Sequence, residues 1–250
     1  MKKTLFISIF MLSFCGIFAQ STVTKTNTTG CGMPYILAMK NGGSYEQTSY
    51  DSKGNATNVF KNIVEKNNNG EVIIRQEGHD VKNKEWEPTS ISFLCTGDGL
   101  IMDPKSMMQI GDLKFKDKSG KSSMNIKNEV SGDKLIIRKN MKVGDNEPDA
   151  KIAVKMIITG MMPMNSVSNI LLKNRKIVLQ EKIKTPIGEF NCFLLEHDVD
   201  SETDIMGMKM TSTSHVKMWF CEERGIVRME IKNEKMKKLN LTQVMTAWNF

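Results

Sequence analysis

The amino-acid sequence predicts an all-β protein built on a curved antiparallel sheet, either an open barrel or a sandwich of meandering strands. Short segments alternate apolar and polar residues with a period of two, as in Ile91, Phe93 and Cys95, which is typical of strands with one buried face. Turn-forming residues such as Asn67 to Gly70 separate these segments. The sequence does not alternate strands with long helices, so a parallel α/β sheet is excluded.

The expected strands follow one another along the chain, and turn chemistry marks where several of them end. Thr185 to Gly188 combines a proline with a glycine, and Glu222 to Gly225 also ends in glycine, so a chain reversal is expected at each. Asp103 and Pro104 suit the N-cap and first position of one short helix over 103–110. The predicted strands are 44–51, 56–65, 71–77, 89–95, 134–139, 151–159, 175–183, 189–198, 205–221, 226–232 and 237–247.

Residues 1–19 read as a cleaved secretory signal. Two lysines precede an uncharged apolar stretch, residues 4–18, and Ala19 is the small residue that a signal peptidase needs before the cut. The stretch is short for a membrane-spanning helix, which needs about 20 apolar residues. A lipoprotein signal is the alternative, but the bulky Phe14 before Cys15 disfavours it.

The signal predicts an exported protein in the periplasm or on the surface of a Gram-negative-type bacterium, not membrane-spanning after cleavage. Residues 20–30 are rich in Ser, Thr and Asn and are expected to be disordered. Residues 31–250 are expected to form a single β-rich domain. Its possible halves, 31–143 and 150–250, would meet at the segment from Gly144 to Asp149.

The formal net charge is +7, but the basic residues are scattered along strands and turns. Lysines on strand edges discourage edge-to-edge pairing, which accounts for this pattern. The aromatic interleaving that accompanies basic grooves for nucleic acid is missing from the sequence. We therefore expect no nucleic-acid partner.

Four cysteines follow the predicted signal, and an even number permits disulfides in an oxidising compartment. A tight turn at Asp200–Thr203 would join strands 189–199 and 204–221, which places Cys192 and Cys221 out of register. This leaves Cys31 and Cys95 as a possible disulfide by elimination. There is no C-x-x-C motif, so no zinc ribbon or thioredoxin-type redox pair is indicated.

The same register argument concerns the histidines. It places His197 opposite Met206 and leaves His215 far along the ladder, which disfavours a two-histidine metal site. Only a longer loop would bring the two rings together.

Methionine is unusually common, with 20 residues in the chain. Met161, Met162 and Met164 cluster near Met156, and thioethers are soft ligands suited to Cu(I). The alternative is that these side chains fill irregular apolar space or line a hydrophobic groove. Met206 to Met210 carries three methionines in alternation, as on one face of a strand.

Several motifs occur in the order found in one known family. "TPIGEFNC" at 185–192 and "WFCEERGIVRME" at 219–230 are similar to the TPxGxF-C and WY-xxxG-(hydrophobic)-V pattern of TapB-like exported bacterial proteins, a domain-of-unknown-function family. Weaker likenesses spread over residues 31–246. Cys221 and Glu222 depart from the family, which usually has small or polar residues there. The resemblance implies an exported, mostly β protein, and it implies no activity and no functional residue.

No catalytic motif was found: the sequence lacks G-x-S-x-G, H-E-x-x-H, a Walker loop and G-x-G-x-x-G. We therefore expect no enzyme and no cofactor. The sequence favours a non-catalytic envelope protein that binds or carries a hydrophobic ligand or a protein partner, with lipid or an envelope protein as partner. The alternatives are a structural or interaction protein with a filled core, and copper binding through Met161, Met162 and Met164.

Overall fold

The computed structural model describes residues 32–68, 70–81, 88–107, 113–116, 122–160, 164–233, 235 and 240–250. The predicted signal at 1–19 and the segment 20–30 lie outside these ranges, as do Cys31, Met161 and Met162. The predicted signal and the predicted disorder of 20–30 therefore stay predictions.

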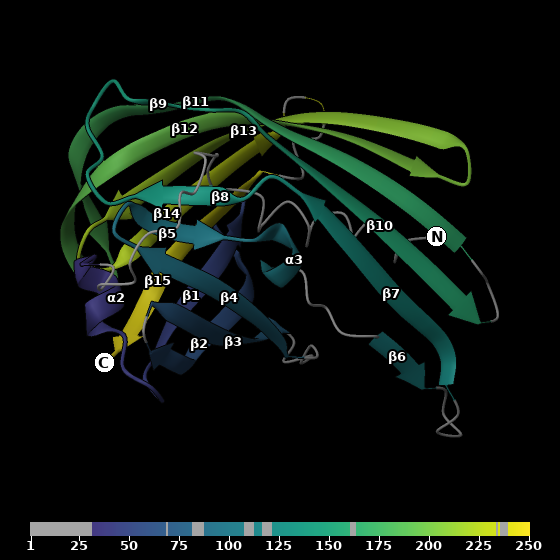
Figure 1. Ribbon diagram of the computed structural model, residues 1–250, viewed down its shortest axis with the longest axis horizontal. Helices are drawn as coiled ribbons and strands as arrows, with labels where there is room; N and C mark the ends of the chain where they lie inside the picture. The colour runs from purple at the N-terminus through teal and green to yellow at the C-terminus, as the bar shows by residue number, and fades with distance from the viewer. Residues whose placement is uncertain are drawn as a thin grey trace.

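The described residues form one antiparallel sheet of fifteen strands (Figure 1). Its order is β6-β7-β10-β11-β12-β13-β14-β15-β1-β2-β3-β4-β5-β8, and β9 pairs with β11 outside this path. The sheet is not closed, because β6 and β8 are its two ends. The predicted all-β class with a curved, open antiparallel sheet is confirmed. The strands are β1 (Ser44–Asp51), β2 (Ala56–Asn68), β3 (Glu71–Asp80), β4 (Thr89–Thr96), β5 (Gly99–Met102), β6 (Leu113–Lys116), β7 (Ser122–Gly132), β8 (Leu135–Arg138), β9 (Asn146–Glu147), β10 (Ala150–Gly160), β11 (Met164–Thr185), β12 (Gly188–Ile205), β13 (Met208–Cys221), β14 (Gly225–Asn233) and β15 (Leu241–Asn249).

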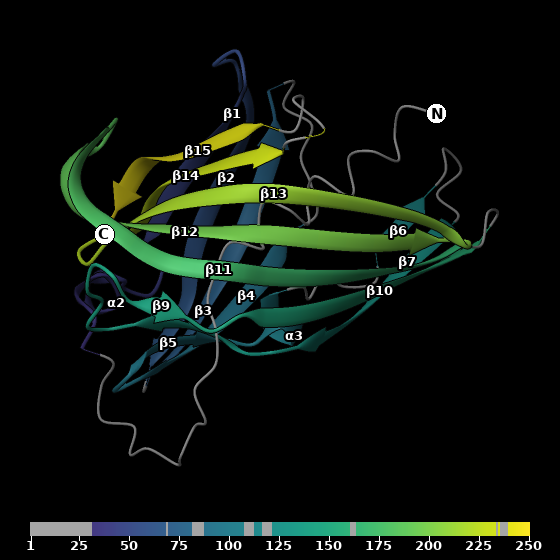
Figure 2. The same cartoon turned by 90° about the horizontal axis from the view of Figure 1, so that it is seen from above.

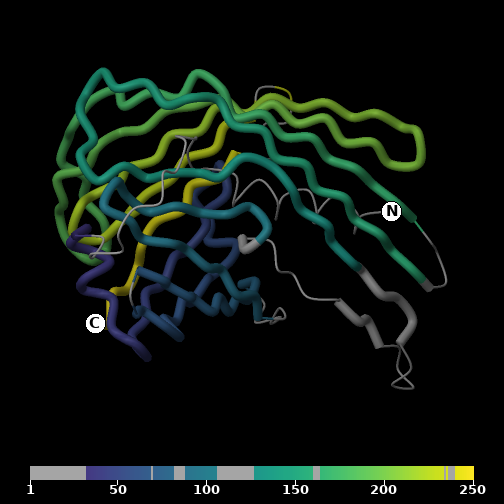
Figure 3. Tube along the Cα trace, in the orientation of Figure 1, coloured from purple at the N-terminus to yellow at the C-terminus, as the bar shows by residue number. Residues whose placement is uncertain are grey.

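The sheet has two differently shaped parts. Strands β1–β5, β8, β14 and β15 curl into a barrel-like end, whereas β7, β10 and the outer lengths of β11–β13 extend away from it as a long wing (Figures 1 and 3). The wing consists of β7, β10, Met164–Asn174, Asp198–Ile205 and Met208–His215. Seen from above, the closed end of the β11–β12 hairpin bends round at the other side of the molecule (Figure 2).

Two short helices accompany the sheet in the part of the chain that the structure describes. Helix α3 (Pro104–Met107) confirms the predicted helix near 103–110, and the Lys105 amide donates to the Asp103 carboxylate at 2.9 Å, as an N-cap requires. Helix α2 (Pro34–Ala38) was not predicted, because five residues are too few for a helical period. Among the described residues, no helix is both long and apolar enough to cross a membrane.

The predicted reversal at Asp200–Thr203 is wrong. Strand β12 continues to Ile205, and the chain turns at Met206 and Gly207, which have φ of 55° and 85°. The acidic run looked like a loop, but its side chains pair with β13, as in the 2.8 Å hydrogen bond from Thr213 to Asp200. A two-residue turn with positive φ at both positions matches the twist of the flanking strands.

The segment from Gly144 to Asp149 was predicted as the place where two halves meet. In the structure this segment contains β9, and β9 pairs with β11. The Gly144 amide donates to the Ile177 carbonyl at 2.8 Å, and the Ile177 amide donates to the Asp145 carbonyl at 2.9 Å. Strands from before and after this segment belong to the same sheet.

The main core lies inside the barrel-like end and continues along β10–β13. Residues that alternate along each strand supply it, so that Val72 and Ile74 of β3 are buried on the same face. A second, smaller core, containing Cys192, Leu194, Trp219, Cys221, Val227 and Met245, lies where the bent β11–β12 hairpin packs on the neighbouring strands.

Candidate functional site

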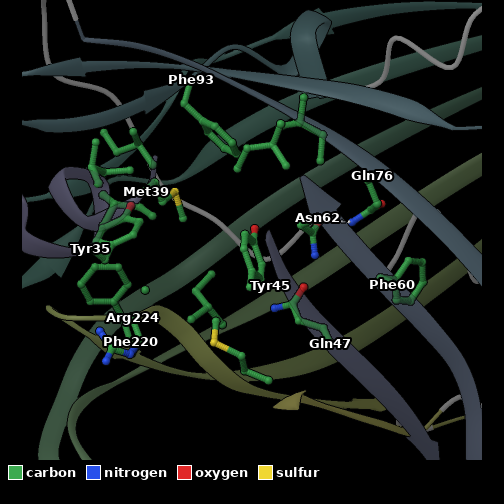
Figure 4. Close-up of a pocket in the computed structure, with 18 of the residues that line it drawn as sticks. Tyr35, Met39, Tyr45, Gln47, Phe60, Asn62, Gln76, Phe93, Phe220 and Arg224 are labelled. Atoms are coloured by element: carbon green, nitrogen blue, oxygen red, sulfur yellow. Dashed lines mark hydrogen bonds between the residues drawn. The ribbon is translucent and has the colours of Figure 1, made fainter. Parts of the chain in front are cut away.

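A cavity of about 130 Å³ lies inside the barrel-like end and is partly open to solvent. Its wall comes from β1–β5, β8 and β13–β15, and residues of α2 cover one side (Figure 4). Most of the lining is apolar and aromatic. Four methionines contribute to the wall, and they are Met39, Met102, Met229 and Met245.

The period of the strands brings polar residues into this apolar wall. Phe60 and Asn62 are two residues apart on β2, and Ile74 and Gln76 are two residues apart on β3, so each pair points to the same face. The register of β2 with β3 places Asn62 directly opposite Gln76. Two amides therefore meet within the cavity wall.

The amide pair is buried and only partly satisfied. Gln76 Nε2 donates to Asn62 Oδ1 at 2.9 Å, and the two residues are 6% and 1% exposed. Asn62 Nδ2 and Gln76 Oε1 have no hydrogen-bond partner within the described part of the chain. If the oxygen and nitrogen positions of both amides were exchanged, one amide NH2 group and one amide oxygen would still have no partner. A buried amide without a partner costs free energy, so this pair favours a guest that can both donate and accept.

Neither free amide atom has appreciable exposed area of its own. A guest can therefore reach them only when a neighbouring side chain of the wall moves. Methionine is the side chain best suited to such movement, because it is unbranched and has three rotatable bonds. The wall has four such side chains.

Two tyrosines lie on the same wall. Tyr35 of α2 packs edge-on against Phe220, with ring centroids 5.5 Å apart, and Tyr45 of β1 packs against Trp248. Burial raises the pKa of both phenols above their ordinary value, with the nearby Tyr45 adding to the shift at Tyr35. Both rings therefore remain neutral at physiological pH.

Arg224 places a positive charge at the rim of the cavity. Its guanidinium carbon lies 4.9 Å from the centre of the Trp248 ring and 5.9 Å from that of Phe190, in cation–π contact. Figure 4 shows Arg224 beside Tyr35 and Phe220 on one side of the cavity, with Asn62 and Gln76 on the other. The site thus has a charged rim and an amide pair at its far wall, and Tyr45 and Gln47 lie between them (Figure 4).

The turn that carries Arg224 depends on Gly225. This residue has a φ of 74°, which side-chain-bearing residues rarely adopt. A Cβ atom here would lie 3.2 Å from the Tyr35 ring, so glycine also leaves room for α2. The Tyr35 amide donates to the Glu222 carbonyl at 2.9 Å, which fixes α2 to this turn. The predicted reversal at Glu222 to Gly225 is confirmed.

The methionines predicted as a copper site are only partly within the described residues. Met156 is buried against Ile158, and the partly buried Met164 packs on both. Met161 and Met162 lie outside the described residues, so copper binding through Met161, Met162 and Met164 stays a prediction. The three methionines of Met206 to Met210 are exposed at the tip of the β12–β13 hairpin and do not contribute to the core.

The predicted positions of the histidines are wrong. His197 lies opposite Val216, and His215 lies opposite Asp198, so the two histidines occupy opposite faces of the sheet. His215 Nδ1 is 2.9 Å from an Asp198 carboxylate oxygen on the partly exposed face, whereas His197 is buried. Within the residues that the structure describes, no group of three or more His, Cys, Asp or Glu could hold a metal ion.

The predicted separation of Cys192 and Cys221 is also wrong, because it followed from the same misplaced turn. The register pairs Phe193 with Phe220, which places Cys192 opposite Cys221. Both are buried and free. Cys95 is buried and disulfide-bonded, while Cys31 lies outside the described residues, so the pairing of these two stays a prediction.

Sequence reasoning missed the cavity, although a signal for it is present. Asn62 falls in phase with the buried residues Phe60 and Val64, and Gln76 falls in phase with Ile74. A polar side chain on the buried face of a strand is either hydrogen-bonded within the core or part of a binding site. The sequence alone shows that Asn62 and Gln76 fall on buried faces. That they lie opposite each other follows only from the register of β2 with β3.

Comparison with known proteins shows a family and a shared fold. A family profile described as DUF3108-like matches residues 40–244. A Bacteroides fragilis protein, described as exported and as having a YmcC-like fold, aligns with a TM-score of 0.59 and 18% identity over 84% of this chain and 97% of that chain. A Parabacteroides distasonis protein described as a lipoprotein aligns with a TM-score of 0.59 and 17% identity over 84% of this chain and 96% of its own. No curated protein sequence matches the chain.

At these identities, the two crystal structures establish a likeness of fold alone. The profile supports a family of unknown function, as the sequence motifs implied. The narrower TapB-like label stays a prediction.

Proposed function

The chain belongs to the DUF3108-like family, and from that premise we propose that it is an exported, non-catalytic envelope protein that binds a small amphipathic molecule in the cavity of its barrel-like end. The ligand has an apolar body and a polar group that both donates and accepts hydrogen bonds. The single observation that carries this proposal is the buried amide pair, Asn62 and Gln76, with one unused donor and one unused acceptor in an apolar wall.

The size of the cavity limits the ligand. An apolar cavity of roughly 150 Å³ in another protein is known to hold benzene, so a cavity of about 130 Å³ suits a single ring or a short chain. A longer acyl chain requires the wall methionines to move aside. The proposal therefore concerns a ring-sized or short-chain group, which could be one end of a larger lipid.

The main alternative is a structural or interaction protein whose core is filled. In that case the amides would be satisfied by water, which occupies polar internal sites with three or so hydrogen bonds. The two accounts differ in whether an organic molecule can displace that water and in whether the amides control the choice of molecule.

Benzyl alcohol and toluene make a discriminating pair of probes, because they share a ring and differ by one hydroxyl group. We expect benzyl alcohol to bind the wild-type protein from a few-fold to about tenfold more tightly than toluene, since one well-placed hydrogen bond contributes about 0.5–1.5 kcal/mol. In the double variant Asn62→Leu/Gln76→Met, the preference should disappear or reverse. Titration followed by ligand-observed NMR gives both dissociation constants.

A second pair of variants tests the location. Ile226→Trp fills space at the cavity wall and should abolish binding of both probes. Val167→Trp adds the same ring at an exposed position on the wing and should leave binding unchanged. Failure of both probes to bind the wild-type protein would favour the filled-core alternative. A hydroxyl preference that survives in the double amide variant would contradict the proposed ligand chemistry.

Export is supported by the signal-like residues 1–19 and by the exported or lipoprotein descriptions of the two proteins with the same fold. We expect the mature chain, recovered from the envelope fraction, to begin at Gln20, with the destination between periplasm and surface given by protease access to whole cells. Intact mass and N-terminal sequencing measure this directly. A chain that retains Met1 and stays in the cytosolic fraction would contradict export.

A further inference from the structure

A pair of free cysteines lies in the second core, apart from the ligand cavity. Cys192 is near the start of β12, and Cys221 is the last residue of β13. The register of these strands pairs Phe193 with Phe220, so the next pair of residues along the ladder is Cys192 and Cys221. They are 0% and 2% exposed.

The strand geometry fits a covalent bond between them. Directly opposed residues of an antiparallel pair have Cα atoms roughly 4.5 to 5.5 Å apart. Disulfides span Cα separations of about 4.4 to 6.8 Å, so no backbone movement is required. The two thiols are neighbours that interact electrostatically.

The surroundings of the pair are built mostly from apolar side chains. Leu194, Trp219 and Val227 pack against the two cysteines, and the bent end of the β11–β12 hairpin covers them. Each sulfur also lies 3.5 Å from a backbone carbonyl oxygen, Cys192 from that of Phe190 and Cys221 from that of Gly225. Within the described part of this core, no group of ligands could make the two thiols part of a metal site.

The two thiols differ in how easily they ionise. The hydrogen bond with Cys192 lowers the pKa of the Cys221 thiol, and the same contact together with burial raises the pKa of Cys192. Because the thiolate is the attacking species in thiol–disulfide exchange, the more readily ionised Cys221 is the thiol that attacks first in the reaction below.

We propose that Cys192 and Cys221 form a disulfide in the exported protein. The proposed oxidant is a protein or small-molecule disulfide, X–S–S–X, of the oxidising compartment. The Cys221 thiolate attacks one sulfur of the oxidant, which forms a mixed disulfide and releases X–S⁻. Cys192 then loses its proton to solvent and attacks the Cys221 sulfur, which forms the Cys192–Cys221 bond and releases the second X–S⁻. Two protein thiols lose two electrons in total, and the oxidant gains them as two thiolates.

Because both sulfurs are buried, the reaction can take place only at certain stages. An oxidant cannot reach them once the hairpin has closed over the second core, so oxidation occurs while the chain folds or opens. The bond would join β12 to the last residue before the turn that carries Arg224. It would therefore hold the rim of the ligand cavity in place.

The sequence allows a direct test, because trypsin places each of the four cysteines after the signal on a different peptide. Cys192 falls in 185–209 and Cys221 in 218–224, whereas Cys31 falls in 26–40 and Cys95 in 85–105. The full chain should be expressed with its own signal, alkylated in denaturant without reduction, and digested. We expect peptides 185–209 and 218–224 to be recovered joined, and to separate only after reduction.

Control arms separate this bond from export and from the other cysteines. The same chain made without its signal and refolded with oxidised glutathione should give the same joined peptides, whatever its natural location. A Cys31→Ala/Cys95→Ala variant should retain the link, and a Cys192→Ala/Cys221→Ala variant should lose it. Recovery of 185–209 and 218–224 as separate alkylated peptides in both preparations would overturn the proposal. So would a link from either peptide to 26–40 or 85–105.

Discussion

At the scale of single residues, the amide pair is the most informative feature of the molecule. Gln76→Met removes the one group that bonds to the Asn62 side chain and leaves that amide buried without a partner. We expect a loss of about 1–3 kcal/mol in the free energy of unfolding, measured by urea denaturation. Adding Asn62→Leu removes the stranded amide as well and should restore much of the loss.

The double variant provides the check on this interpretation. If the two changes simply add, and the double variant is less stable than Gln76→Met by a further 1 kcal/mol or so, the amides contribute to stability rather than to binding. A double variant that is more stable than Gln76→Met and approaches the wild-type protein is the expected outcome.

Gly225 supports the rim in two ways that can be separated. Gly144→Ala is the matched control, because Gly144 has a φ of 96° and open space around its Cα. We expect Gly144→Ala to cost about 1 kcal/mol from backbone strain alone, and Gly225→Ala to cost roughly 2 kcal/mol or more, since its Cβ also meets the Tyr35 ring. Thermal or urea unfolding gives both values. Equal losses would mean that α2 does not pack against the turn as described.

At the scale of elements, the β12–β13 hairpin ends in a turn that its sequence does not favour. Met206 has a φ of 55° in a two-residue turn with Gly207, a place that Asn or Asp usually occupies. Met206→Asn should therefore raise the free energy of unfolding by roughly 0.5 kcal/mol. Met208→Asn, at the exposed strand position next to the turn, is the control and should give no gain. A gain in both variants would point to lost surface hydrophobicity rather than to turn geometry.

The same hairpin carries a ladder of charges that makes stability depend on pH. Burial alone would raise the pKa of Asp198, but hydrogen bonds from Asn174 and His215 and the charge of Lys173 outweigh it and lower that pKa. Because the folded pKa is below the unfolded value of about 3.9, the stabilisation is present above that pH and is lost as pH falls through the folded pKa.

Asp198→Asn should thus cost less than about 1 kcal/mol at pH 6.5, since the site is partly exposed, and the cost should be smaller at pH 2.5. Urea midpoints of the variant and the wild-type protein at the two pH values measure this. A difference that stays constant with pH would mean that the carboxylate charge is not involved.

Sequence patterns predicted the elements that have one buried and one exposed face. The strand 44–51 was predicted with the bounds that β1 has, and Asn67 to Gly70 marked the β2–β3 reversal. The outer half of β11 was not predicted, because Ser166 and Ser168 occupy buried positions where an apolar residue would reveal the period. β7 was not predicted either, because Asn128 interrupts the alternation of apolar residues along it.

The register between neighbouring strands was the second feature that the sequence did not predict correctly. The cluster of acids and hydroxyls from Asp200 to Asp204 has the composition of a turn, but the side chains of Asp200, Ser201 and Glu202 each have a partner on β13. Misplacing that one turn moved His197, His215, Cys192 and Cys221 to the wrong neighbours, because a shift in register changes every cross-strand pair. The cavity depends on pairings between β2 and β3 and could not be assembled from composition alone.

At the scale of the whole molecule, the sheet encloses space at one end and extends as a wing at the other (Figure 1). The barrel-like end has the large core, the amide pair and a charged rim, whereas the wing has exposed methionines at its hairpin tip. The account assigns ligand binding to the barrel-like end. Because methionines occur in both parts, labelling of methionine methyl groups allows the two parts to be compared in one experiment.

Methyl NMR of protein labelled at the methionine methyl groups tests this claim most directly. On addition of benzyl alcohol, we expect shifts at the cavity residues Met39, Met102, Met229 and Met245, and none at the exposed Met206, Met208 and Met210. Shifts confined to the hairpin tip, or no shifts at saturating probe, would contradict the account.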